Sequence, residues 1–407
     1  MASQESPFKK RKTDQSSNMS GAPDQFEGFL IHDSNKWTEF KKGKFTPKHF
    51  EDYDIDIENE CCGVCGSDVH TITGGWGELA VKPLCVGHEV IGKVLRVGPK
   101  VKSFKPGQRV GVGAQVQSCM RCRMCKSNNE NYCPHMVDTY MAPYNENGGN
   151  PELTMEESQK PMKDSKGNQI FSQGGYSSHS RVHEQFVFPV PQNLPSELVA
   201  PMMCAGLTVY SPLVRAGTGP GKKVAIVGIG GLGHFALIWA KALGAEVTAI
   251  SHSPNKKDDA ISLGADHFVS SKDKNWAEPH AFEYDFVLNT ADMTHQFDIA
   301  EYLSIVNING EFHHVGLPDE PLPQFKAQIF ASNGSKMGGS HIGSKKEALE
   351  MLDLASKIYE KGIKPRIETI DISEKGCAEA VQKVKSNNVR YRVTLTGFHK
   401  AFGTGKN

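Results

Sequence analysis

The chain has 407 residues, enough for two or three domains that each bury a core of their own. Its 46 Lys and Arg residues balance 46 Asp and Glu residues, which argues against nucleic acid or an anionic membrane as the main partner. Mean hydropathy is negative, and no apolar stretch approaches the ~20 residues that span a bilayer. The expected partners are therefore small molecules.

Residues 1–25 are polar and predict a disordered tail. The tail holds one basic cluster, Lys9, Lys10, Arg11 and Lys12, for which a nuclear import signal is the alternative interpretation. Nothing in the tail resembles a cleaved presequence, so we expect a cytoplasmic protein.

Residues 26–116 carry short strand-like runs separated by Gly and Pro, which predict a small, irregular β-rich domain. The clearest runs are FEGFLIH, DYDIDIENECCG, EVIGKVLRVG and QRVGVGAQV. Residues 141–174 are polar and rich in Asn, Glu, Lys, Gly and Pro, which is typical of a long surface loop. Strand-like character returns at SRVHEQFVFPVP.

Four cysteines between these segments follow the spacing C-x2-C-x2-C-x7-C: Cys119, Cys122, Cys125 and Cys133. Four thiolates in a short polar segment predict one tetrahedral structural Zn²⁺, whose binding would order the lobe at residues 117–135. Disulfides are disfavoured because the remaining cysteines show no framework of pairs. An iron–sulfur cluster is the alternative, and it has no support elsewhere in the chain.

From residue 200 the pattern changes to alternating strands and helices, which predicts a doubly wound parallel sheet. The apolar run KKVAIVG predicts a buried strand, GLGHFALIWAKALGA a helix and EVTAIS a second strand. HFVS, DFVLNT and GEFHHVGL continue the strands. A helix at KKEALEMLDLASKIYEKG and late strands at IETIDI and VRYRVTLTG predict a return to the first domain.

The first strand of this sheet leads into a G-x-G-x-x-G turn formed by Gly228, Ile229, Gly230, Gly231, Leu232 and Gly233. A turn between strand and helix brings backbone amides to a pyrophosphate at the helix N-terminus, which predicts dinucleotide binding. An NAD-preferring site would carry an acid at the end of the second strand. Ser251, His252 and Ser253 stand there, followed by Lys256, so NADP(H) is the favoured cofactor.

A second metal site is suggested by donors in ECCGVCGSDVH (Glu60–His70) and VGHEVIGKVLRVG (Val86–Gly98). A thiolate and an imidazole from separate loops suit a Zn²⁺ that keeps a position open for substrate, and Cys204 could supply a third ligand. Cys62 and Cys65 also form a C-x-x-C pair, although no thioredoxin-like context supports a redox role.

At Gly87-His88-Glu89-x2-Gly92-x5-Gly98-x2-Val101, followed by the four-cysteine lobe, the chain resembles the zinc-dependent medium-chain alcohol dehydrogenases. CGVCGSD, QGGY, CAGLTVYSPLVR and VRYR resemble the cinnamyl alcohol dehydrogenase branch, above all its yeast NADP-dependent, broad-specificity members. The resemblance implies an α/β fold with a GroES-like β-rich catalytic domain at residues 26–204 and a Rossmann domain at 205–343. Residues 344–407 would return to the catalytic domain, and the enzyme would be a homodimer with two Zn²⁺ per subunit.

The resemblance also implies residue roles. Cys65, His88 and Cys204 would bind the catalytic zinc, with Glu89 as a neighbouring carboxylate that can approach the metal. Asp68 would hold the imidazole of His88. Ser67 and His70 would form a proton relay. The residues implied to meet the nicotinamide side of the cofactor are Thr208, Thr290, Gly316, Ser340, His341 and Ile342.

Two features depart from the family pattern. His252 stands where some relatives place an arginine against the 2′-phosphate, and the segment at 145–172 is longer than expected. The implied reaction is the reversible NADPH-dependent reduction of aldehydes to primary alcohols. A dedicated biosynthetic enal or imine reductase of the same fold is the alternative, and a non-catalytic scaffold is disfavoured because no zinc ligand is missing.

Overall fold

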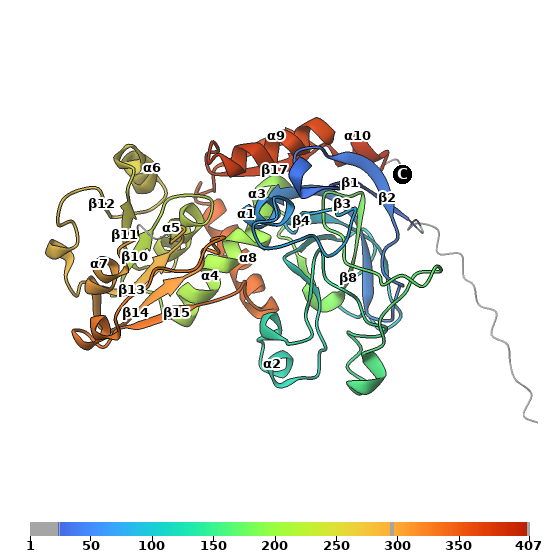
Figure 1. Ribbon diagram of the computed structural model, residues 1–407, viewed down its shortest axis with the longest axis horizontal. Helices are drawn as coiled ribbons and strands as arrows, with labels where there is room; N and C mark the ends of the chain where they lie inside the picture. The colour runs from blue at the N-terminus through green and yellow to red at the C-terminus, as the bar shows by residue number, and fades with distance from the viewer. Residues whose placement is uncertain (1–22, 24, 294–296, 405–407) are drawn as a thin grey trace, which may run out of the picture.

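The computed structural model describes residues 23, 25–293 and 297–404. Most of the tail predicted at 1–25, including its basic cluster, lies outside them. Within the described chain two sheets dominate, and Figure 1 shows them in separate halves of the molecule, with the C-terminal helices above the N-terminal half. The predicted GroES-like and Rossmann domains are thus both present.

The sheet of the first half has seven strands in the described residues. Its order is β16 (Ile367–Asp371), β17 (Arg392–Thr396), β3 (Asp54–Val64), β4 (Val90–Val97), β5 (Arg109–Val112) and β9 (Val187–Pro189), with β8 (His179–His183) also paired to β3. Two small ribbons accompany it: β1 (Phe26–Leu30) with β2 (Lys41–Phe45), and β6 (Gln115–Gln117) with β7 (Val137–Asp138).

The register of this sheet positions the first candidate site. β3 and β4 are antiparallel, and Cys62 near the end of β3 pairs with Val90 at the start of β4. The residue after β3 and the residues before β4 therefore lie side by side. β17 is antiparallel to β3, and Val393 pairs with Val64, so the C-terminal segment reaches the same place.

The second half holds a six-stranded sheet in which every described pairing is parallel. Its order is β12 (His267–Ser270), β11 (Glu246–Ser251), β10 (Lys223–Val227), β13 (Tyr284–Asn289), β14 (Val306–His314) and β15 (Lys336–Gly339). The chain winds outward in both directions from β10. Ligands of such sheets bind beyond the carboxyl ends of the strands at this reversal point.

The helices cover and connect the two sheets. They are α1 (Gly66–Ile72), α2 (Arg123–Lys126), α3 (Ser196–Val199), α4 (Ala205–Arg215), α5 (Gly233–Ala242), α6 (Lys257–Ser262), α7 (Ile299–Ser304), α8 (Lys345–Tyr359), α9 (Glu374–Lys385) and α10 (Phe398–Phe402). Short 3₁₀ helices are η1 (Ser34–Lys36), η2 (Glu130–Tyr132), η3 (Glu156–Ser158), η4 (Glu184–Phe186), η5 (Ala200–Met203), η6 (Pro254–Lys256), η7 (Glu278–His280) and η8 (Ala327–Ala331).

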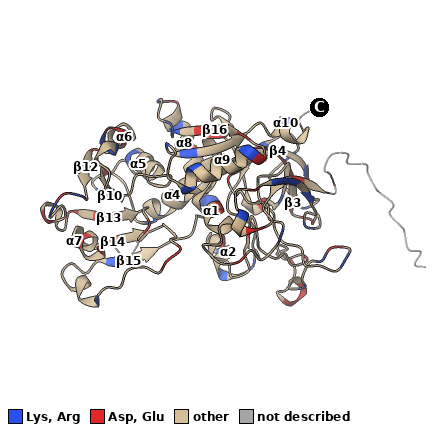
Figure 2. Ribbon diagram, turned by 45° about the horizontal axis from the view of Figure 1, so that its top comes forward, with Lys and Arg blue, Asp and Glu red and all other residues tan. Residues whose placement is uncertain are grey.

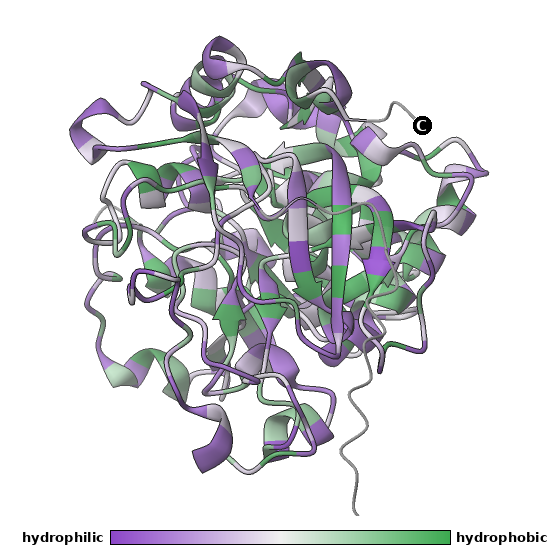
Figure 3. Cartoon of the chain, turned by 90° about the vertical axis from the view of Figure 1, so that its right-hand side faces the viewer, coloured by the Kyte–Doolittle hydropathy of each residue, from purple (hydrophilic) through white to green (hydrophobic). Residues whose placement is uncertain are grey.

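Surface chemistry agrees with the balanced composition. Figure 2 shows acidic and basic residues interspersed along the ribbon, and Figure 3 shows strands on which hydrophilic and hydrophobic residues alternate. Within the described residues no single helix is long and apolar enough to cross a membrane. One bent pair, Ser196–Met203 with Ala205–Arg215, meets that test by length and composition alone.

The segment predicted as a long surface loop is mostly irregular, but it is anchored. Isolated bridges join Pro143 to Phe171 and Asn145 to Pro161, and the side chain of Met162 is fully buried. Arg121 of the four-cysteine lobe donates a hydrogen bond of 2.7 Å from Nη1 to the carbonyl oxygen of Asn150. The loop therefore supports the lobe rather than standing free of it.

Candidate metal centres and cofactor cleft

Four potential ligands meet where β3, β4 and α4 converge. Cys65 directly follows β3, His88 and Glu89 directly precede β4, and Cys204 lies between η5 and α4. One donor atom from each of the four lies within 4.8 Å of all the others, and all four residues are buried. We call these residues the catalytic cluster.

The donor spacing of the catalytic cluster fits a metal ion. His88 Nε2 lies 3.2 Å from Cys204 Sγ, and the sulfurs of Cys65 and Cys204 are 3.9 Å apart. Tetrahedral zinc, with Zn–S of ~2.3 Å and Zn–N of ~2.0–2.1 Å, separates its donors by about 3.6–3.8 Å. Two thiols, an imidazole and a nearby carboxylate therefore suit zinc here.

The two thiols of the cluster already favour one thiolate. Their hydrogen bond lowers the pKa of Cys65 well below its ordinary value, and the same bond raises the pKa of Cys204. Because thiolates bind zinc, Cys65 is the sulfur best prepared for metal.

Asp68 on α1 holds the imidazole of His88 in place. Its Oδ1 lies 3.1 Å from His88 Nδ1, and the backbone N–H of Gly87 donates to Oδ1 at 3.2 Å. Oδ2 accepts from the N–H of Cys65 at 3.0 Å and from the hydroxyl of Tyr176 at 3.3 Å. This arrangement leaves Nε2 of His88 as the nitrogen facing the sulfurs, the orientation a metal ligand needs.

Glu89 forms a buried ion pair with Arg392, the first residue of β17. Burial raises the pKa of Glu89 to about 8, and the Arg392 guanidinium opposes that rise. The other carboxylate oxygen, Oε2, has no hydrogen-bond partner within the described chain. It occupies space left by Gly63, where an added Cβ would lie 1.9 Å away. A buried, unpaired oxygen beside three metal donors is suited to approach a cation.

The four predicted structural ligands also converge. Cys119, Cys122, Cys125 and Cys133 place their sulfurs within 4.8 Å of one another. Neighbouring Sγ–Sγ distances include 3.5 Å for Cys119–Cys133 and 3.8 Å for Cys122–Cys133. A tetrahedral zinc would hold sulfurs about 3.8 Å apart. A hydrogen bond from Cys133 also lowers the pKa of Cys125 to about 5, which favours the thiolate.

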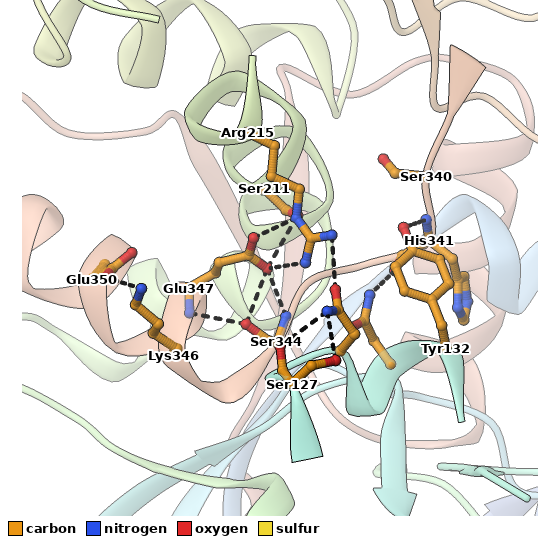
Figure 4. Close-up of polar contacts among 12 residues, drawn as sticks. Ser127, Tyr132, Ser211, Arg215, Ser340, His341, Ser344, Lys346, Glu347 and Glu350 are labelled. Carbon is orange, nitrogen blue, oxygen red and sulfur yellow. Dashed lines mark hydrogen bonds and ion pairs between the residues drawn. The ribbon is translucent and has the colours of Figure 1, made fainter. Parts of the chain in front are cut away.

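The spacer between the third and fourth cysteines contacts the second half of the molecule. Figure 4 draws the part of this network around Arg215, Tyr132 and His341. Its contacts are Asn129 Oδ1 with Arg215 Nη1 at 3.0 Å, Glu130 Oε1 with the N–H of Lys345 at 2.7 Å, Asn131 Nδ2 with the carbonyl of His341 at 2.8 Å, and the Tyr132 hydroxyl with the N–H of His341 at 3.2 Å. The lobe thus hydrogen-bonds to both backbone groups of His341, its N–H and its carbonyl oxygen.

The glycine turn lies at the reversal point of the parallel sheet, between β10 and α5. Gly228 has a φ of +84°, and a Cβ on Gly233 would lie 1.9 Å from the carbonyl oxygen of Gly228. A Cβ on Gly230 would meet nothing within 4 Å, so that position is open to a ligand. A Cβ on Gly231 would lie 3.1 Å from Arg392 Cδ. The turn therefore fits a pyrophosphate and touches the arginine that pairs with Glu89.

The expected adenosine-binding residues gather at the carboxyl end of β11. Ser251 is buried and accepts a hydrogen bond from the N–H of Ser253 at 3.1 Å, whereas His252 is exposed. Lys256 donates to the carbonyl oxygen of Ile229 in the glycine turn at 2.8 Å. Nearby Asp259 is engaged by guanidinium groups, so its carboxylate is not free for a ribose. A serine hydroxyl and a lysine ammonium without a free carboxylate suit a 2′-phosphate better than a pair of ribose hydroxyls.

The residues expected beside the nicotinamide lie after strands β13, β14 and β15 and on helix α4. Thr290 follows β13, Gly316 follows β14, Ser340, His341 and Ile342 follow β15, and Thr208 lies on α4. Thr290 Oγ1 donates to the carbonyl oxygen of Gly228 at 2.8 Å, and Ser340 Oγ lies 2.9 Å from His313 Nε2. The expected cofactor residues thus line the carboxyl ends of consecutive parallel strands.

Of the two relay residues, Ser67 lies beside the catalytic cluster: its Oγ is 3.6 Å from Cys65 Sγ. His70, one turn further along α1, instead pairs with Asp319 of the second half. The sequence alone assigns no role to Asp319, Arg392 or Tyr176. VRYR identifies the family, but nothing local marks its second arginine as the partner of a glutamate 303 positions away.

Comparison with known proteins finds a family match in each half of the chain. Residues 51–192 match the alcohol dehydrogenase GroES-like domain, and residues 231–357 match the zinc-binding dehydrogenase family. NADP-dependent alcohol dehydrogenase 6 of Saccharomyces cerevisiae is 42% identical over 382 residues, covering 93% of this chain and 99% of its own. The chain belongs to the zinc-dependent alcohol dehydrogenase family.

Among solved structures, the chain is similar to cinnamyl alcohol dehydrogenases, the branch of the family expected from the sequence. A cinnamyl alcohol dehydrogenase from Sorghum bicolor aligns with a TM-score of 0.78 at 34% identity, over 91% of this chain and 97% of that one. The corresponding enzyme from Helicobacter pylori, complexed with NADP(H), aligns at 0.77 and 33%, over 91% and 98%. The resemblance expected from the zinc signature is confirmed.

Proposed function

We propose that the enzyme reduces aldehydes to primary alcohols with NADPH, reversibly, and that it holds two zinc ions per subunit. The observation that carries this proposal is the position of Arg392. It pairs with Glu89 of the catalytic cluster and packs against Gly231 of the glycine turn. The metal donors and the dinucleotide turn are thereby held next to each other where the two halves meet, as hydride transfer to a polarised carbonyl requires.

When bound, zinc supplies electrophilic polarisation of the carbonyl oxygen and NADPH supplies the hydride. The protein must orient these groups and deliver a proton to the oxygen. Asp68 fixes the tautomer of His88, and Ser67 is the hydroxyl beside the donor atoms. In reduction, the Ser67 hydroxyl would give its proton to the substrate oxygen, and His70 would replace that proton from solvent.

Preference for NADPH over NADH rests on the carboxyl end of β11. Ser251 stands where an acid would bind ribose hydroxyls, and Lys256 lies over the glycine turn. The lysine can attract a 2′-phosphate, and no free carboxylate repels it. His252 is exposed, whereas Lys256 is held against the glycine turn, so we expect Lys256 to dominate the preference.

Assembly and location complete the proposal. β15 is the end strand of the described six-stranded sheet, so its outer edge can pair with the same strand of a second copy. We infer a cytoplasmic homodimer that acts on small aldehydes and alcohols.

The test is an assay of aliphatic, aromatic and unsaturated aldehydes with NADPH and NADH, combined with metal analysis. We expect reduction of several aldehydes, higher kcat/KM with NADPH, and two zinc equivalents per subunit. Ser251→Asp with Lys256→Ala should shift the preference toward NADH, because charge repulsion is added and attraction is lost. Reduction confined to the C=C bond of enals, or to imines, would instead establish the dedicated biosynthetic reductase.

A further inference from the structure

Two loops from opposite halves of the molecule meet beside α1. One is the turn at 73–77 that follows α1, and the other is the loop at 315–320 that follows β14. His70 Nδ1 lies 2.6 Å from Asp319 Oδ1. The His70 imidazole stacks on the Trp76 indole with a centroid distance of 5.0 Å and an interplanar angle of 6°. The indole N–H donates to the carbonyl of Leu317 at 3.3 Å. His70 is therefore held by both loops.

The close approach of Asp319 depends on a glycine. A Cβ on Gly75 would lie 2.3 Å from Asp319 Oδ1, so any larger residue would push the carboxylate away. The backbone N–H of Gly75 also donates to the carbonyl of His70 at 2.9 Å, which closes the turn beneath the imidazole. The turn is shaped to receive a carboxylate from the other half.

We propose that Asp319 is a positioning residue for the proton relay, supplied across the cleft by the dinucleotide-binding half. The proposal rests on the relay role given above to His70. An ionised carboxylate only accepts hydrogen bonds, so His70 Nδ1 carries a proton toward Asp319. The remaining nitrogen, Nε2, is then the one free to exchange protons, much as second-shell carboxylates fix the tautomer of other functional histidines.

The cross-domain origin of Asp319 gives the contact a second consequence. His70 lies on α1 of the catalytic half, whereas Asp319 follows β14 of the half that carries the glycine turn. Separation of the two halves would withdraw the carboxylate and leave both tautomers of His70 accessible. The relay is thus complete only in the arrangement that also brings the glycine turn to Arg392.

A purely structural salt bridge is the competing explanation. The side chains of His70 and Asp319 are 23% and 37% exposed, and pairs at that exposure stabilise folding only slightly. Loss of the carboxylate should therefore leave the fold intact and affect the relay alone.

A double-mutant cycle on the full-length, zinc-loaded enzyme separates the two explanations. Asp319→Ala should lower the single-turnover rate of alcohol oxidation about 10-fold with little change in KM, in the range typical of second-shell partners. Asp319→Asn, whose amide oxygen still accepts from Nδ1–H, should recover most of that rate. In a His70→Ala background, Asp319→Ala should have no further effect. Equal losses in both backgrounds would overturn the proposal.

A readout without turnover keeps this result independent of the proposed activity. In enzyme with ¹⁵N-labelled histidines, the His70 resonance, identified by its loss in His70→Gln, should report the Nδ1–H tautomer. Asp319→Ala and Gly75→Ala should both shift it toward a mixture. Glu78→Gln, at an exposed acid directly after this turn, should not. An unchanged tautomer in Asp319→Ala would refute the positioning role, whereas a shifted tautomer in an enzyme without reductase activity would refute only the proposed function.

Discussion

The catalytic cluster and the four-cysteine lobe offer similar donor atoms but are built in opposite ways. The lobe takes its ligands from 15 consecutive residues, and Cys122 and Cys125 are only partly buried. The catalytic cluster draws on donors up to 139 positions apart, all buried, and adds a carboxylate paired with an arginine. The lobe offers four sulfurs, whereas the cluster offers three strong donors and a carboxylate with one unpaired oxygen. A zinc site with four protein ligands stabilises the fold, whereas a site that keeps one coordination position open can bind substrate.

Their surroundings differ as well. Asn131 and Tyr132 in the spacer of the lobe hydrogen-bond to the backbone of His341, one of the residues expected beside the nicotinamide. The catalytic cluster is linked to the glycine turn through Arg392, a buried charge. Substitutions can therefore distinguish a centre that does chemistry from one that holds the architecture.

The largest expected effect is on activity at the catalytic cluster. Cys65→Ala removes the thiol best prepared for metal, so aldehyde reduction should fall by about 10³-fold or more, the scale on which loss of a principal electrostatic catalyst acts. The lobe should keep its zinc, so metal analysis should fall from two equivalents to one. Retained activity, or loss of both metals, would erase the distinction between the sites.

Breaking the buried ion pair should cost stability. Arg392→Met leaves Glu89 without its counter-ion, and removing one member of such a pair costs about 3–5 kcal/mol. Denaturant unfolding should show a lower midpoint. Adding Glu89→Gln in the same chain should recover part of the loss because no unpaired charge remains. If the double variant were no more stable than the single one, the pair would not be the source of the effect.

The lobe should respond in stability more than in chemistry. Cys119→Ser should lower the free energy of unfolding by about 3 kcal/mol, a fraction of the ~10–16 kcal/mol that zinc-finger peptides gain from zinc. Activity per zinc-loaded catalytic site should remain within about threefold. A chemical denaturation curve and metal-normalised kinetics measure both quantities. A loss of activity as deep as that of Cys65→Ala would show that the lobe takes part in catalysis.

The smallest effect should appear in cofactor affinity. Tyr132→Phe removes the hydroxyl that accepts from the N–H of His341, and one neutral hydrogen bond is worth about 0.5–1.5 kcal/mol. NADPH should bind about 2–10-fold more weakly, as measured by quenching of protein fluorescence. Tyr359→Phe, on α8 and outside this network, is the control. Unaltered affinity would mean that the lobe does not reach the cofactor through His341.

Strands with a clear apolar pattern are predictable from the sequence, whereas edge strands and loop anchors that depend on distant partners are not. Apolar runs such as KVAIV and EVTAIS predict strands that the structure contains as β10 and β11. β2 and β15 were not predicted, because KKGKF and KMGG lack apolar alternation and are strands only through their partners. The long segment at 145–172 reads as a free loop in sequence, since its anchors, Met162 and the Arg121 contact, depend on distant packing.

The sequence alone determined the two ligand sets in different degrees. Spacing within 15 residues was sufficient for the lobe, because a short segment can place four thiolates around one ion whatever surrounds it. The glycine turn was equally local, since strand, turn and helix are consecutive. For the catalytic cluster, the residues suggested a thiolate, an imidazole and Cys204 but left the set open, and the family resemblance specified Cys65, His88 and Cys204.

The tertiary structure decided what joins these parts. Antiparallel pairing of β3 with β4 brings Cys65 to His88, and the return of β17 beside β3 delivers Arg392 to Glu89. The loop after β14 brings Asp319 to His70 across 249 positions. Such contacts carry no local signature, because a single Asp or Arg gains its partner only from strand order and register. Charge and hydrogen bonding act through space, and the fold alone sets those distances.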